Sequence, residues 1–287
     1  MAGTKLILDY TTISDFLTCR MRWYWRHRRN LTPIQKSLAL LFGQAMHLGL
    51  KAFYIKDDPI EAFKQAYQPE DIADGEKRTV EHGIMILEKY MKEYVTNPFE
   101  IVECNGSHLI ELSKDVTYAA RMDAIIKWEG KTIYVMEHKT TSTLGYYFFE
   151  TFQLNHQIDG YTVACKDKYG KCEGVLIDAI STKKEVLTTA EATSTNPLVH
   201  RKKAPSFMRD IVTRTVEQQN NFGKEVVDIA GNIMYAIEHD SYPMNKSMCN
   251  YYGACPFRQL CLYGEGAMEM YEVSVWDART GKEIKSG

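Results

Sequence analysis

The sequence predicts a mixed α/β protein in which helices flank a central mixed sheet. Three observations support this class. Apolar residues follow a helical spacing through the first third of the chain, the spacing changes to that of strands near residue 99, and helices and strands alternate after residue 146. The 287 residues contain no Pro/Gly/Ser-rich linker, so we expect one domain over residues 1–287.

The helical part is expected to span about residues 12–96. Thr12-Ile13-Ser14-Asp15 has the pattern of a capping box, which predicts the start of a first helix. Three more helices are expected from the apolar spacing, and Asn97-Pro98 ends the last of them. They cover residues 38–54, 60–67 and 78–94.

The core is expected to span about residues 99–240. Four strand-like runs predict an antiparallel meander. They cover residues 99–104, 109–112, 118–128 and 132–136. The elements expected after the meander are a helix over 147–168, a strand over 173–181, a polar loop or flap over 185–206, a strand over 207–214 and a helix over 216–239.

Composition sets limits on the class of protein. The formal net charge is -2, so any attraction to nucleic acid must come from local patches. The N-terminus lacks the pattern of a secretory signal, and no apolar run is long enough to span a membrane. We therefore expect a cytoplasmic protein without a membrane partner, in which the seven cysteines are thiols or metal ligands.

An acid pair and a lysine lie at the ends of two neighbouring predicted strands. Asp123 is near the end of one strand, and Glu137 and Lys139 end the next, with Glu129-Gly130 as the turn between them. Two carboxylates and an ammonium at one point suit a divalent cation and a water that attacks a phosphodiester. The alternative is a surface hairpin with a cross-strand ion pair.

Two helical motifs flank these strands. His47 ends Gly43-x-x-x-His47; its imidazole suits Mn²⁺, and Gly43 allows the helix to approach the sheet closely. Gln157 and Tyr161 are four residues apart and share one helix face, from which they could bind a phosphate or the lysine. A buried core histidine and an ordinary helix surface are the structural alternatives.

Three cysteines cluster near the C-terminus and a fourth lies near the N-terminus. The trio is Cys249-x5-Cys255-x5-Cys261, and Cys19 is the distant one. Four thiolates are the number that a [4Fe–4S] cluster needs. Zinc usually takes closer cysteine pairs, and free thiols in a turn-rich tail are the third alternative.

Taken together, these residues resemble the ordered motifs of the PD-(D/E)XK nuclease superfamily, in its RecB-like branch. The motifs that carry the resemblance are Gly43-x-x-x-His47, Asp123, Glu137-x-Lys139 and Gln157-x-x-x-Tyr161. Cys19 with the C-terminal trio resembles the iron–sulfur subset of that branch, which includes Cas4 proteins, the AddB nuclease domain, Dna2-type nucleases and phage-borne relatives. The resemblance extends from about residue 12 to residue 261.

The resemblance implies a restriction-endonuclease-like core and an exonuclease that uses Mg²⁺ or Mn²⁺ to cut DNA in recombination, repair or replication. The implied metal ligands are His47, Asp123, Glu137 and the backbone carbonyl of His138. Lys139 is the implied water-activating residue, supported by Gln157 and Tyr161. Many iron–sulfur members carry a C-x2-C or C-x3-C pair, whereas Cys249 and Cys255 are more widely spaced.

The implied partner is DNA, single-stranded or with ends, and a helicase or recombination partner and an oligomeric state are left open. Five arginines interleave with three aromatic residues over residues 20–29, and His200-Arg201-Lys202-Lys203 forms a second basic segment. Both are candidate DNA contacts, and both could equally be solvated. Two other functions compete with the nuclease: an accessory DNA-end-binding subunit of a recombination or CRISPR-adaptation complex, and an iron–sulfur redox protein.

Overall fold

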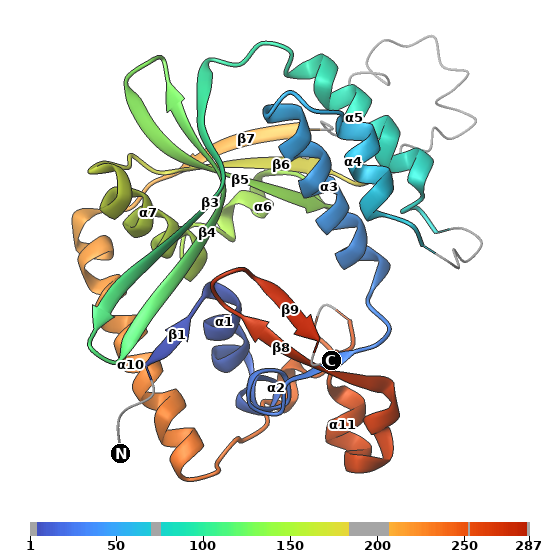
Figure 1. Ribbon diagram of the computed structural model, residues 1–287, viewed down its shortest axis with the longest axis vertical. Coiled ribbons are helices and arrows are strands. Elements are labelled where there is room, and N and C mark those ends of the chain that lie inside the picture. Colours follow the sequence, from blue (N-terminus) through green and yellow to red (C-terminus); the bar gives the residue numbers. More distant parts are fainter. Residues whose placement is uncertain (1–4, 70–75, 184–206, 252, 286–287) are drawn as a thin grey trace.

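A six-stranded mixed sheet forms the centre of the computed structural model, which describes residues 5–69, 76–183, 207–251 and 253–285. The strand order is β1-β4-β5-β6-β7, and β3 pairs with β4 (Figure 1). The strands are β1 (Leu6–Leu8), β3 (Phe99–Ser113), β4 (Val116–Trp128), β5 (Thr132–Thr141), β6 (Val175–Ser181) and β7 (Phe207–Val212). The predicted mixed α/β class with a central sheet is confirmed.

The predicted antiparallel meander is present as β3, β4 and β5. The sheet becomes mixed because β6 pairs parallel to β5 and β7 then pairs antiparallel to β6. The two strands predicted at 99–104 and 109–112 are in fact one strand. Residues 106–108 continue the pairing with β4, and the pairing register shifts only between Ile101 and Glu103 and again between Glu111 and Ser113.

Strand β4 has two different partners along the edge that faces away from β3. Its first residues pair with β1 up to Tyr118, and its last residues pair with β5 from Ala124 onward. Residues 119–123 between these two ladders pair with neither β1 nor β5. The sheet therefore opens at Asp123.

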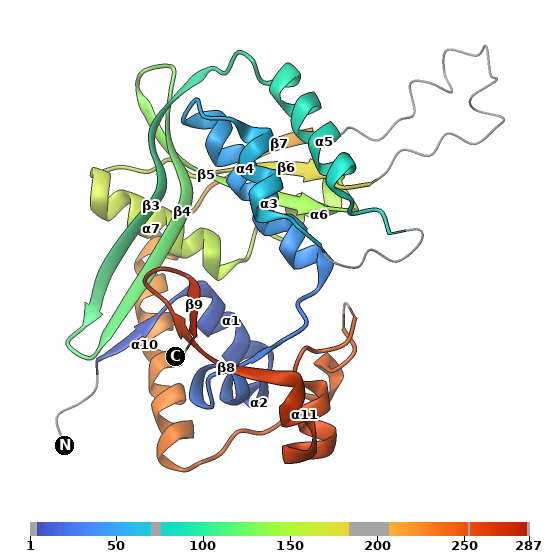
Figure 2. The same cartoon turned by 45° about the vertical axis from the view of Figure 1, so that its right-hand side comes forward.

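Helices cover both faces of the sheet (Figures 1 and 2). One face packs against α3 (Leu38–Tyr54), α4 (Pro59–Ala66) and α5 (Val80–Glu93), and the other against α7 (His156–Tyr169) and α10 (Val216–Glu238). Strand β6 shows the alternation directly. Ile180 belongs to the cluster with α3–α5, whereas Ile177 and Ala179 belong to the cluster with α7 and α10.

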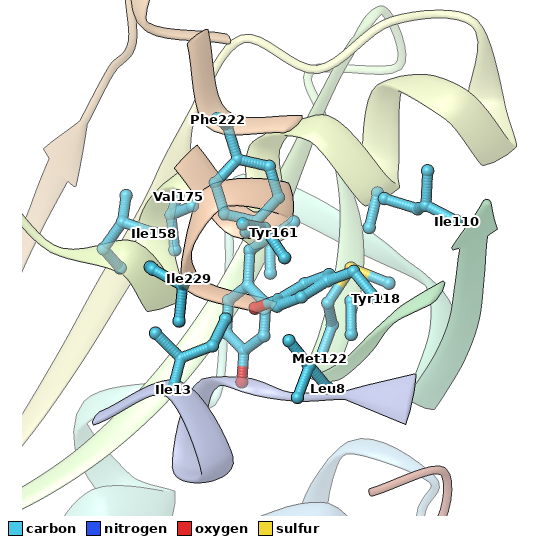
Figure 3. Close-up of a cluster of buried hydrophobic side chains, with 14 of the residues drawn as sticks. Leu8, Ile13, Ile110, Tyr118, Met122, Ile158, Tyr161, Val175, Phe222 and Ile229 are labelled. Atoms are coloured by element: carbon cyan, nitrogen blue, oxygen red, sulfur yellow. The ribbon is translucent and has the colours of Figure 1, made fainter. Parts of the chain in front are cut away.

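The larger cluster joins strands, α7, α10 and the N-terminal helix α1 (Tyr10–Thr18). Figure 3 shows Tyr118 of β4, Tyr161 of α7 and Phe222 of α10 side by side in this core. Tyr118 and Phe222 are fully buried and meet edge to face, with ring centroids 5.0 Å apart. None of the helices in the described part of the chain is long and apolar enough to cross a membrane.

The first helix begins earlier than the capping-box pattern predicted. Asp9 is the actual N-cap, and its carboxylate accepts hydrogen bonds from the backbone N and the hydroxyl of Thr12. Asp15 is instead buried within α1, where Arg22 and Arg26 form ion pairs with it at 2.7 and 3.2 Å. Arg22 and Arg26 are partly exposed and are committed to these ion pairs, and their contact with DNA stays a prediction.

The helix predicted over 147–168 is two helices, α6 (Tyr146–Glu150) and α7. Asn155 breaks it, because its side chain caps α7 by accepting from the backbone N of Gln157. The loop predicted over 185–206, with His200-Arg201-Lys202-Lys203, lies outside the described residues.

A second, three-stranded sheet joins the two ends of the chain. It consists of β2 (Leu31–Pro33), β8 (Tyr271–Asp277) and β9 (Lys282–Lys285). The short helices α2 (Arg20–Trp23) and α11 (Arg258–Tyr263) lie near it. A small apolar cluster around Leu31, Phe257 and Tyr271 supports this end of the protein. The segments that carry Cys19 and Cys261 are thereby held together.

Candidate active site

Asp123 and Glu137 follow directly from the register of the β4–β5 hairpin. The ladder ends at the pair Ala124–Met136, so Asp123 and Glu137 are the next residues on the two strands. The strands separate there. Asp123 Oδ2 accepts the backbone N–H of His138 at 2.9 Å, which is a donor that a continued ladder would have used.

Glu137 and Lys139 lie on one face of β5 and meet α7. Glu137 is 3% exposed, and its Oε1 accepts hydrogen bonds from Lys139 Nζ at 2.6 Å and from Gln157 Nε2 at 3.0 Å. Lys139 Nζ also donates to Gln157 Oε1 at 2.9 Å. Gln157 Nε2 donates in addition to the Tyr161 hydroxyl at 2.8 Å. The four side chains form one connected group.

His47 reaches the site from α3 on the other side. Its Nδ1 lies 3.2 Å from Asp123 Oδ1 and 3.1 Å from Oδ2. The helix approaches the sheet closely at Gly43, where an added Cβ would lie 3.2 Å from Thr140 Oγ1. The structure therefore brings together His47, Asp123, Glu137, Lys139, Gln157 and Tyr161, all of which the sequence singled out.

The charges of the site act on one another strongly. Burial would raise the pKa of Asp123, but the neighbouring His47 and His138 lower it well below its usual range. Burial and the Asp123 charge raise the pKa of Glu137. Burial would lower the pKa of Lys139, but Glu137 raises it, so Lys139 stays an ammonium at neutral pH. The two acids thus differ: Asp123 is firmly ionised and Glu137 is the easier one to protonate.

The donor set suits a divalent cation. Two carboxylates and an imidazole are acceptable ligands for Mg²⁺ or Mn²⁺. Glu137 Oε2 is buried and has no hydrogen-bond partner among the residues that the structure describes, and a cation would satisfy it. Within the described residues, no three His, Cys, Asp or Glu side chains are gathered closely enough to hold a metal as they stand. Asp123 and Glu137 instead each contact a neighbouring side chain, His47 and Lys139.

A comparison with models of protein families identifies the family of this chain. A model of the PD-(D/E)XK nuclease superfamily matches residues 8–262. The chain belongs to this superfamily. The match extends over every motif from Gly43 to Cys261, and it confirms the superfamily that the sequence predicted. PD-(D/E)XK nucleases typically use divalent metal ions.

Solved structures of low sequence identity share the fold. A candidate exonuclease from Eubacterium rectale has a TM-score of 0.52 at 12% identity, with 91% of this chain and 94% of that chain covered. An alkaline exonuclease from Laribacter hongkongensis has a TM-score of 0.32 at 10% identity, with 70% of this chain and 95% of that chain covered. The first likeness supports the PD-(D/E)XK fold of the central sheet. A comparison with curated proteins gives no match.

The four predicted cluster cysteines line one cavity of this PD-(D/E)XK protein. Cys19, Cys249, Cys255 and Cys261 share a cavity of about 510 Å³. All four are free thiols and half-buried. Burial raises the pKa of Cys255 and of Cys261. The thiols surround a common space although they do not converge on one point.

Sequence reasoning missed a second polar group behind the site. Asp178 in β6 is 0% exposed, and its carboxylate lies 3.0 Å from His138 Nδ1. From the sequence, only the backbone carbonyl of His138 was expected to take part, as a metal ligand. The available signal was a single acid inside the otherwise apolar strand Val175–Ser181. Arg209 of β7 is its second partner, at 3.0 Å.

Replacing Gly160 by alanine is expected to destabilise the protein. A Cβ at Gly160 would lie 2.2 Å from the Tyr118 hydroxyl, so α7 must move away from β4. Overpacking of this kind costs about 1–3 kcal/mol. Chemical denaturation would measure the loss. Gly231→Ala in α10 is the control. Its Cβ would meet no atom of the described residues within 4 Å, so the free energy of unfolding should be unchanged or higher. Equal stabilities of the two variants would contradict the expectation.

Proposed function

We propose that this PD-(D/E)XK protein is a metal-dependent DNA nuclease, and specifically an exonuclease that acts in DNA recombination, repair or replication. One observation carries the proposal. Lys139 Nζ is held between Glu137 and Gln157. Glu137 and Asp123 are the first residues beyond the paired part of β5 and β4. In a hairpin with an incidental ion pair, a half-buried glutamine that bonds both members of the pair would have no role.

Four groups would hold the cation: the side chains of His47, Asp123 and Glu137, and the backbone carbonyl of His138. A bound Mg²⁺ or Mn²⁺ supplies positive charge that stabilises the phosphate oxygens during hydrolysis. A cation would also lower the pKa of Glu137 by favouring its ionised form. Cation binding would thus favour the ionised form of Glu137, the acid that is easier to protonate in the free protein.

Lys139 would orient the attacking water and stabilise negative charge. Its raised pKa keeps it protonated, so it acts as a hydrogen-bond donor in the free protein. Gln157 fixes the ammonium by accepting from it, and Tyr161 fixes Gln157 in turn. These contacts hold Nζ beside the carboxylate of Glu137, so the ammonium is positioned before a substrate binds.

A [4Fe–4S] cluster held by Cys19, Cys249, Cys255 and Cys261 would assign the protein to the RecB-like, iron–sulfur branch with Cas4, AddB and Dna2-type nucleases. The shared cavity of the four thiols supports this assignment. The cluster would be a structural link between the chain ends within a single nuclease domain. Its role would not require electron transfer.

The test is a cleavage assay on protein purified without oxygen. DNA labelled at the 5′ or the 3′ end, single- or double-stranded, is incubated with Mg²⁺ or Mn²⁺. We expect mononucleotides or short products that appear from one end and that vanish with a chelator. Internal cuts would replace the exonuclease by an endonuclease. DNA binding without any cutting would support the accessory end-binding subunit and overturn the proposal.

A further inference from the structure

A row of polar side chains crosses three strands on the face of the sheet opposite Glu137 and Lys139. His138 of β5 is in register with Asp178 of β6, and Asp178 is in register with Arg209 of β7. Side chains in register on adjacent strands point to the same face. His138 therefore points away from its two neighbours in sequence, toward α3 and α5.

Asp178 joins the row. Its Oδ2 lies 3.0 Å from His138 Nδ1 and accepts the Tyr90 hydroxyl, and its Oδ1 accepts Arg209 Nε at 3.0 Å. The Asp178 carboxylate is fully buried and forms an ion pair with the guanidinium of Arg209, which carries a permanent positive charge. An ionised carboxylate only accepts, so His138 carries its proton on Nδ1. The tautomer of His138 is thereby fixed.

Arg209 is held at every part of its guanidinium. Nη1 donates to Asn97 Oδ1 at 2.8 Å, and Nη2 donates to the hydroxyls of Tyr54 at 2.8 Å and Tyr90 at 3.1 Å. The guanidinium also lies 3.5 Å from the ring centroid of Tyr94. The network extends from β7 to helices α3 and α5. A side chain fixed in this way is a rigid support for Asp178.

The network reaches the candidate active site through His138. The ring of His138 stacks on Tyr54, with centroids 5.6 Å apart and an interplanar angle of 16°. The backbone N–H of the same residue donates to Asp123 Oδ2. His138 is therefore fixed by its side chain on one face and presents its backbone to the carboxylate of Asp123.

We propose that Asp178 and Arg209 are positioning residues for the active site, because they hold His138 and thereby the Asp123 carboxylate. The inference rests on the proposed function, since it assigns these residues to the cation site of the nuclease. Groups that orient the ligands of a metal typically change metal affinity or activity by about 10- to 100-fold when they are removed. A network that only stabilised the fold would change stability alone.

The test measures Mn²⁺ binding to the full chain by calorimetry, without DNA, and cleavage under single-turnover conditions. Asp178→Asn is expected to weaken the Kd for Mn²⁺ about tenfold and to lower the cleavage rate, with the KM for DNA unchanged. This variant leaves Arg209 buried without its ionic partner and could fail to fold. The double variant Asp178→Leu/Arg209→Met removes both charges and should fold, with the same loss of Mn²⁺ affinity.

Tyr67→Phe is the matched control. It removes a buried hydroxyl that bonds the carbonyl of Arg78 in the same helical layer, without contact to His138. It should lower the Tm and leave the Kd for Mn²⁺ unchanged. A folded double variant with the parental Kd and cleavage rate would overturn the inference.

The parent protein separates this inference from the proposed function. If the parent binds Mn²⁺ but cuts no DNA, the nuclease proposal fails, and the ratio of the Kd values of variant and parent still decides the positioning role. If the parent binds no Mn²⁺, both fail.

Discussion

Lys139→Ala is expected to reduce DNA cleavage by about 10²- to 10⁴-fold, the range for loss of a group that manages protons or water in the reaction. Lys139 Nζ contacts both Glu137 and Gln157, and no backbone element depends on it. Its side chain is 26% exposed, so the protein should stay folded. The rate should fall with little change in the KM for DNA, because the ammonium acts in the transition state.

Lys114→Ala provides the control for this loss. Lys114 also carries one positive charge, but its side chain is 90% exposed in the turn between β3 and β4. Its removal should leave the cleavage rate unchanged. A Lys139→Ala protein that cuts as fast as the Lys114→Ala protein would show that the water-activating role is wrong.

The proposed cluster would make the anaerobically purified protein brown, and Cys255→Ser is expected to remove this colour and to lower the stability sharply. A cluster that joins Cys19 to the C-terminal trio closes most of the chain into one loop. By analogy with a disulfide across such a loop, the restriction of the unfolded chain contributes about 5 kcal/mol. Iron analysis, the visible spectrum and thermal unfolding would measure both effects.

Cys104→Ser is the matched control for the cluster. Cys104 is half-buried on β3 and does not line the cysteine cavity. Its substitution should leave iron content and colour unchanged. A parent protein that is colourless and free of iron after anaerobic purification would rule out the cluster, and zinc in its place would favour the structural zinc alternative.

The candidate site could be predicted because its central part is local in sequence. Asp123 and Glu137 belong to one hairpin, and strand alternation places Lys139 on the face of Glu137. Gln157 and Tyr161 follow on the next long helix. His47 was a candidate from its imidazole and the Gly43-x-x-x-His47 spacing, but no local rule predicts that α3 brings it to Asp123.

Other features depend on contacts that are distant in sequence. The Asp178–Arg209 pair arises only from the register of β6 with β7, across residues 184–206. Helix α1 starts at Tyr10 because Asp9 caps it. The capping-box pattern that begins at Thr12 led to a later predicted start. In the sequence, Arg22 and Arg26 belong to a basic segment that is a candidate DNA contact. Only the structure shows that both form ion pairs with the buried Asp15.

We propose that Asp123, Glu137 and Lys139 form a metal-dependent cutting site. The most direct measurement compares the parent with Glu137→Gln in parallel, on end-labelled DNA with Mn²⁺ and after anaerobic purification. Glutamine keeps the shape of the side chain and removes its charge. We expect the parent to degrade the DNA at least about 10²-fold faster than the variant, and only without chelator. Equal rates, or cleavage that persists in chelator, would contradict the claim.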